Sequence, residues 1–197
     1  MTSNHLKALL LVTLRDPAQA ARLLIGLNLP MPARWMALFL AVSVSGLLAW
    51  LGNQVAPIPD EFRTPLRDAM SQPLVMAAIQ LGAVMIAAGL MSAVGRAFGG
   101  HGRFHDALLL TVWIEAVLLL FQFLQIISAL IIPVLASMLG MIAFVLFFWL
   151  TVQFTRELHG FTSGFKVLLV MIGTAFVLGF LLSILAVSFG LLPEMPQ

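Results

Sequence analysis

The chain has 197 residues, of which 61% are hydrophobic and only 9% are charged, and its formal net charge is +2. Soluble domains carry about 25% charged residues, so this composition excludes an ordinary soluble domain and indicates a membrane protein. The absence of cysteine excludes disulfides, a thiol nucleophile and a thiolate metal site, and no dense Lys/Arg stripe with interleaved aromatic residues suggests nucleic-acid binding.

Residues 1–34 are apolar but interrupted, and they form a segment ahead of the first membrane span. Their first apolar run, Ala8–Leu14, is too short to cross a membrane. Asp16 followed by Pro17 is typical of a helix start, with Asp as the cap and Pro in the first turn. We therefore predict two short amphipathic helices at the cytoplasmic membrane surface.

The second of these helices is expected to have a polar and an apolar face. Its polar face holds Gln19, Arg22 and Gly26, and its apolar face holds Ala20, Leu23, Leu24 and Leu27. The helix either lies in the interface plane, with Arg22 near lipid phosphates, or packs under the bundle. A cleaved signal peptide is a further interpretation, because residues 18–20 mimic a cleavage site, but Arg15 and Asp16 directly after the apolar run argue against it.

The remaining apolar stretches predict five membrane spans. A crossing needs about 20 largely apolar residues, and the stretch 107–155 is far too long for one crossing. Pro133 is its only proline, so a tight hairpin near 132–134 divides it. The spans are 35–55, 73–95, 107–131, 134–155 and 166–192, which together form an all-α transmembrane bundle, 35–192, followed by an extracytoplasmic tail, 193–197.

The distribution of basic residues predicts the orientation of the bundle. Arg63 and Arg67 lie between the first two spans, among three acidic residues, and the other eight of the ten basic residues fall on the opposite side. Lys and Arg are enriched in cytoplasmic loops. We expect a multi-pass protein of the inner (plasma) membrane with a cytoplasmic N-terminus and an extracytoplasmic C-terminus.

Small residues at helical spacing predict where the helices touch, since close packing drives association in lipid. The expected faces are Ala41, Ser45 and Ala49 on the first span, Gly82, Gly89 and Ala93 on the second, Ala136 and Gly140 on the fourth, and Ala175, Gly179 and Ser183 on the fifth. Packing within one chain is the default interpretation, and contacts in an oligomer are the alternative.

Glu115 is a lone carboxylate in the middle of an apolar span. Thr111 and Gln122 fall on the same side of the predicted helix, which gives a polar stripe that should face protein rather than lipid. Depth matching places Ser43, Ser45 and Thr174 of other spans near its level, and Gln80 of the second span is also within reach. With no cation expected at this depth, Glu115 should be protonated.

This intramembrane polar site has two interpretations. It is either an interhelical clamp, whose bonds stabilise by about 0.6 kcal/mol each, or a site for a proton or small solute. Transporters usually show several ionisable groups and broken helices, whereas here there is one such group. The clamp is therefore the favoured interpretation.

The two glycine-bearing loops on the cytoplasmic side offer no catalytic pattern. GRAFGGHGRFHDA, 95–107, lacks the lysine and hydroxyl residue of a phosphate-binding loop. Contact with lipid head groups is expected from Arg22, Arg96, Arg103, Arg156 and Lys166. A metal set from His101, His105, Asp106, Glu157 and His159 is conceivable, but glycine in the loop and ordinary solvation argue against it. We predict no enzyme, no metal and no cofactor.

Topology and loops together resemble the bacterial branch of the Yip1-domain family. The resemblance rests on five tight spans after an amphipathic N-terminus, on a GxxFGGxGxF loop after the second span, and on ELHGF, 157–161, after the fourth. It covers residues 9–192. Eukaryotic members are membrane proteins of the early secretory pathway that bind Rab-type GTPases and membrane-protein partners. Their pattern includes a Tyr-Gly motif, and this chain has no tyrosine, so GTPase binding is doubtful.

Two functions remain as hypotheses. The first, which the resemblance implies, is a non-enzymatic adaptor or membrane organiser that binds membrane lipids and a membrane-protein partner or a second copy of itself. The second is a transporter or channel for a small solute, lipid or proton that uses Glu115.

Overall fold

The computed structural model describes residues 3–56 and 72–188, and every regular element among them is an α-helix. The predicted all-α fold is confirmed, and five of the helices are long and apolar enough to cross a membrane. The helices are α1 (Ser3–Arg15), α2 (Pro17–Gly26), α3 (Met31–Val55), α5 (Pro73–Ala97), α6 (Phe104–Ile131), α7 (Pro133–His159) and α8 (Gly164–Ser188). The segment with Arg63 and Arg67, the predicted end of the last span and the tail lie outside the described residues.

Prolines and one aspartate set the helix starts. The Asp16 carboxylate accepts a hydrogen bond from the backbone N–H of Gln19 at 2.9 Å, and Pro17 occupies the first turn of α2. This cap satisfies a backbone donor that has no partner within the helix. The long apolar stretch breaks at Ile132, between the end of α6 and the start of α7 at Pro133, as predicted.

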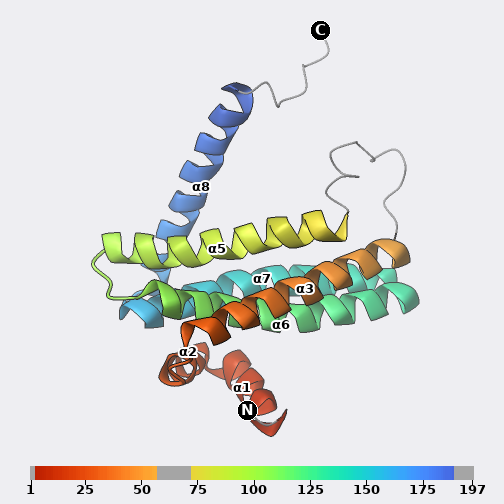
Figure 1. Ribbon diagram of the computed structural model, residues 1–197, viewed down its shortest axis with the longest axis horizontal. Helices are drawn as coiled ribbons and strands as arrows, with labels where there is room; N and C mark the ends of the chain where they lie inside the picture. The colour runs from red at the N-terminus through yellow and green to blue at the C-terminus, as the bar shows by residue number, and fades with distance from the viewer. Residues whose placement is uncertain (1–2, 57–71, 189–197) are drawn as a thin grey trace.

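The helix α6 is the centre of the bundle. It packs against α3, α5 and α7, which run alongside it in Figure 1, and it carries the most extensively buried surface of the membrane-spanning helices. α8 contacts α7 at one end and then diverges from the other helices (Figure 1), so most of its large side chains are exposed. The loops α5–α6 and α7–α8 lie at the same end of the bundle, which we call the basic end because Arg34, Arg96, Arg103, Arg156 and Lys166 lie there.

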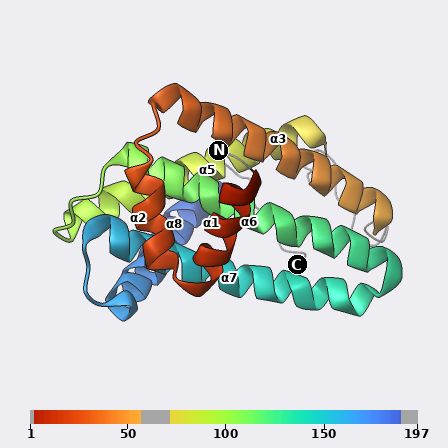
Figure 2. The ribbon, with the colours of Figure 1, turned by 90° about the horizontal axis from the view of Figure 1, so that it is seen from below.

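The N-terminal helices pack on the side of the bundle. α2 contacts α6 and α7, and α1 contacts α2, so the two lie across the α6–α7 pair in Figure 2. Leu9 of α1 and Leu24 of α2 are buried in the same apolar cluster as Trp113 and Leu150. Of the two predicted arrangements, the structure therefore has α2 packed on protein, against the flank of the bundle.

The apolar face predicted for α2 is correct only in part. Ala20 and Leu24 are buried, but Leu23 and Leu27 are 48% and 42% exposed. The buried face is centred on Ala20, Ala21 and Leu24, because that side meets α6 and α7. Leu23 and Leu27 border it and remain available to lipid.

Only some of the predicted small-residue faces form contacts. Ala41 of α3 is buried, and a Cβ added at Gly140 of α7 would lie 2.7 Å from the Gln125 Nε2 of α6, so these two predicted positions do form helix contacts. Gly46, which was not predicted, also lies at a close approach, because a Cβ there would lie 3.5 Å from the Ala77 Cβ of α5. A Cβ at Gly82, Gly89 or Gly179 would meet nothing within 4 Å. The default prediction of packing within one chain is therefore wrong for these positions, because α5 turns its opposite face to α3 and α6, and α8 leaves the bundle.

Candidate functional site

Glu115 lies between α6 and α5, half-buried, and is bonded to a single side chain among those described. The Gln80 amide donates a hydrogen bond to its carboxyl at 2.9 Å. Gln80 was expected within reach of Glu115, and this contact is confirmed. The pair links the central helix to α5 in the middle of the apolar bundle.

Two further amides on α6 reach two further helices. The Gln122 amide donates to the Ser45 carbonyl of α3 at 3.3 Å, and the Ser45 hydroxyl lies 3.5 Å from the Gln122 amide oxygen. The Gln125 amide points to the Ala136 carbonyl of α7 at 3.4 Å. The polar residues of α6 therefore contact α5, α3 and α7 in turn, as a series of interhelical clamps would.

Three predicted members of this site lie elsewhere. Ser43 is exposed on the outer side of α3, and the Thr111 hydroxyl, although buried, donates to the Ala107 carbonyl of its own helix at 2.6 Å. Thr174 lies in a groove between α5, α7 and α8 and donates to the Val170 carbonyl at 2.8 Å. Depth matching was therefore wrong for Ser43 and Thr174, because it gives the level of a residue but not the face of its helix. Thr111 shares the face of Glu115 as predicted, but its hydroxyl is taken up by its own helix.

At the basic end, the side chain of His159 fills a pocket made of glycines. It is 3% exposed, and a Cβ at Gly95, Gly100 or Gly102 would overlap its ring. The Gly102 amide donates to its Nδ1 at 3.0 Å, and its Nε2 lies 2.8 Å from the Met91 carbonyl. Because a carbonyl only accepts, Nε2 carries the hydrogen and the ring is neutral in this arrangement.

A buried arginine closes the same end between α3 and α6. Arg34 is 2% exposed, and its Nη1 donates to the Asp106 carboxylate at 2.9 Å and to the His105 carbonyl. Its Nε donates to the Leu29 carbonyl at 2.8 Å. This arginine was counted for orientation only. Its position two residues after Pro32, at the start of an apolar helix, was the available signal.

The cations predicted to meet lipid head groups have different surroundings. Arg22 forms an ion pair with Glu157 at 2.9 Å, which ties α2 to the end of α7. Arg96 and Arg103 are exposed around the α5–α6 loop, and the Arg96 Nε also bonds the Ser92 carbonyl at 3.3 Å. Arg156 and Lys166 flank the α7–α8 turn. All five lie toward the basic end.

The conceivable metal set is dispersed by these contacts. His159 bonds backbone groups, Glu157 pairs with Arg22, and Asp106 pairs with Arg34. Among residues 3–56 and 72–188, no group of three or more potential ligands is placed to hold a metal ion.

These features define a class: a polytopic α-helical membrane protein with five candidate spans and a pair of short helices on its flank. The family model of the Yip1 domain matches residues 11–186, which is most of the chain, and the protein belongs to the Yip1 domain family. Comparisons with curated proteins and with solved structures gave no match.

Proposed function

We propose that this Yip1-family protein is a non-enzymatic membrane organiser and adaptor. The observation that carries the proposal is the lateral position of α1 and α2 on one half of the bundle. The Trp113 indole donates to the Thr13 hydroxyl at 2.9 Å, and Trp113 lies nine residues into α6, about 13 Å along the helix. With a hydrocarbon core of about 30 Å, the pair of helices occupies one leaflet.

The exposed side of this pair carries apolar surface next to the exposed cations Lys7, Arg15 and Arg22. Large side chains on it are 42–57% exposed: Leu6, Leu11, Leu14, Leu23 and Leu27. Inserted beside the bundle in one leaflet only, they widen the molecule there, and such a wedge favours a membrane that is convex on that side.

The test is protein density as a function of vesicle diameter. Fluorescent protein reconstituted with its basic end outward should be denser per unit area in small vesicles than in large ones. Leu11→Gln with Leu14→Gln should remove the preference, since both side chains are exposed and neither supports the core. Arg15→Gln, also exposed and adjacent, is the matched control. Equal density at all diameters for the unmodified protein would contradict the proposal.

The adaptor part of the proposal rests on the same helices and on the two loops at the basic end. Mass spectrometry of proteins that co-purify in native-lipid nanodiscs should find a defined membrane-protein partner. Deletion of residues 1–30 should release it, and Glu115→Gln should not. If the deletion leaves every partner and lipid association intact, this surface is not the adaptor site.

The orientation supports a cytoplasmic role. Eight of the ten basic residues lie in α1 and α2, in the end turns of the spans at the basic end, or in the α5–α6 loop. We place this end in the cytoplasm and the protein in an inner membrane.

Transport through the bundle is the second candidate function. The observation in its favour is an ionisable side chain, Glu115, in the middle of the apolar bundle, with the polar side chains of Gln122 and Gln125 farther along the same helix. Glu115→Gln should abolish proton or solute flux in proteoliposomes if this candidate is correct, while equal flux in both proteins removes it. A Gln122→Cys variant adds a second readout, because a hydrated path makes that thiol accessible to small polar reagents.

A further inference from the structure

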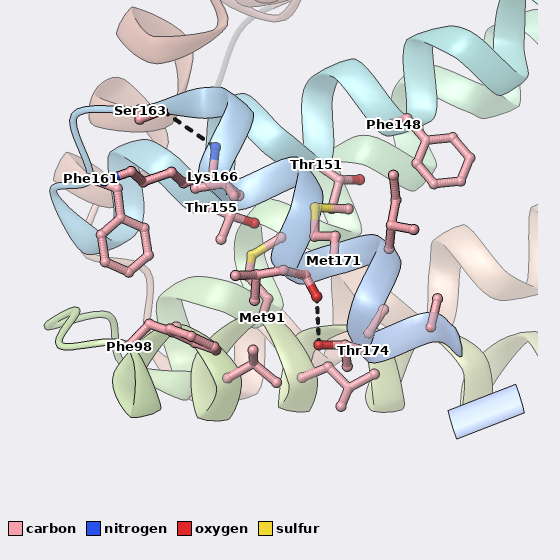
Figure 3. Close-up of a pocket in the computed structure, with 18 of the residues that line it drawn as sticks. Met91, Phe98, Phe148, Thr151, Thr155, Phe161, Ser163, Lys166, Met171 and Thr174 are labelled. Carbon is pink, nitrogen blue, oxygen red and sulfur yellow. Dashed lines mark hydrogen bonds between the residues drawn. The ribbon is translucent and has the colours of Figure 1, made fainter. Parts of the chain in front are cut away.

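A groove with a volume of about 690 Å³ separates α8 from α5 and α7 (Figure 3). Its volume lies in the range of about 300–1,000 Å³ that is typical of ligand sites. Met91 and Met171 face each other across it, and Phe98 and Phe161 lie at one end (Figure 3). Phe98 and Ile172 are 64% and 53% exposed, so the groove is open to the membrane along its side.

The polarity of the groove changes along its length. Thr162, Ser163 and Lys166 line it at the basic end. Deeper in the membrane, Thr151 and Thr174 donate to the carbonyls of Phe147 and Val170 on their own helices, so their hydroxyls are already satisfied. The deep part is therefore effectively apolar.

Two cations stand at the polar mouth. Lys166 lies in the first turn of α8, and the Arg156 Nη1 lies 3.9 Å from the position that a Cβ would take on Gly164. Among the described residues, neither Arg156 nor Lys166 pairs with a carboxylate, whereas the neighbouring Glu157 is taken by Arg22. The mouth thus carries uncompensated positive charge beside donor groups.

We propose that this groove binds one anionic phospholipid, with its phosphate at Arg156, Lys166 and the Ser163 hydroxyl and an acyl chain between α5 and α8. Charge and polarity argue for a lipid over a helix of another protein. Donors and cations gather only at the depth of the head groups, and the remainder is apolar and open sideways to the hydrocarbon. Arginine and lysine side chains with a hydroxyl are ordinary ligands of a phosphate ester.

Native mass spectrometry of the full chain in detergent provides the test, with phosphatidylglycerol and phosphatidylcholine as probes. The unmodified protein should retain one phosphatidylglycerol and bind it about tenfold more tightly than phosphatidylcholine, since charge-assisted bonds to the two cations separate the two lipids. Arg156→Gln with Lys166→Gln should remove the difference. Arg103→Gln, an exposed cation at the same end, should keep it. Equal affinities for the two lipids overturn the proposal.

Two substitutions to phenylalanine on α8 test where the acyl chain lies. Ala175 lines the groove, while Val177 on the same helix does not and is 55% exposed. Ala175→Phe should lower retention of phosphatidylglycerol, and Val177→Phe should not, provided both variants unfold at the same temperature as the unmodified protein. Full retention by a folded Ala175→Phe variant would place the lipid outside the groove and overturn the assignment.

Soluble glycerol phosphate separates a lipid site from a simple phosphate site. It lacks the acyl chains, so an excess should leave bound phosphatidylglycerol in place. Displacement by glycerol phosphate would show that the cations alone bind the anion. If the unmodified chain instead retains a second protein and no lipid, the groove binds a helix of that partner.

Discussion

At the scale of single residues, one histidine accounts for the spacing of three glycines. The His159 ring occupies the space that side chains at Gly95, Gly100 and Gly102 would need, and it bonds the backbone of Met91 in α5 and of Gly102 in the α5–α6 loop. Phe161 stacks on the ring with a centroid distance of 5.4 Å. The glycine loop and the ELHGF motif are therefore two halves of one packing unit.

Gly95→Ala should destabilise the protein by about 1–3 kcal/mol, because the new methyl group overlaps the buried imidazole. Gly82→Ala on the same helix is the matched control, where the methyl group meets nothing within 4 Å, and it should be neutral or stabilising by up to about 1 kcal/mol. Thermal unfolding in detergent measures both.

When His159 is already replaced by alanine, Gly95→Ala should lower the free energy of unfolding much less than it does in the unmodified protein, because the ring that the methyl group would overlap is gone. Additive effects of the two changes would mean that the methyl group and the ring do not share this space.

At the scale of elements, α1 is held by one buried hydrogen bond and by apolar packing. The Thr13 hydroxyl accepts from Trp113 and donates to the Leu9 carbonyl at 2.8 Å. Thr13 is fully buried, so water cannot replace either partner. Because a hydrogen bond is directional, it fixes the position of α1 along α6. The leucine contacts are not directional and do not fix this position.

Thr13→Val should therefore loosen α1 without unfolding the bundle. It leaves the Trp113 donor unpaired at a cost of about 1–3 kcal/mol, so amide exchange of residues 3–15 should become about tenfold faster. Hydrogen exchange with mass spectrometry measures this. Thr13→Ser keeps the hydroxyl and should exchange like the unmodified protein, and equal exchange in the Val variant would show that packing alone holds the helix.

At the scale of the whole molecule, α6 is enclosed and α8 stands apart. α6 contacts three spans and the N-terminal pair, whereas α8 has one firm neighbour and bounds the lipid groove. Arg34, Arg96, Arg103, Arg156 and Lys166 lie at the basic end, and α1 and α2 lie on one side of the bundle (Figure 1), so the described part of the molecule is asymmetric from end to end.

Labelling of single cysteines tests this asymmetry, because the chain has no cysteine of its own. Gln72→Cys and His101→Cys lie at opposite ends of α5, and both positions are exposed. In intact cells, a membrane-impermeant maleimide should label the Gln72→Cys variant and reach the His101→Cys variant only after permeabilisation. The reverse pattern would invert the proposed orientation.

The sequence by itself determined the all-α membrane class, the five spans, the break before Pro133 and the Asp16 cap, because hydropathy, proline and helix caps act locally. It also placed Gln80 within reach of Glu115. Tertiary structure alone decided that His159 fits the glycines, that Arg34 is buried, that Leu23 faces outward and that Thr174 belongs to a groove. Those outcomes depend on which helix faces which, and within a uniformly apolar helix the hydrophobic pattern does not mark a face.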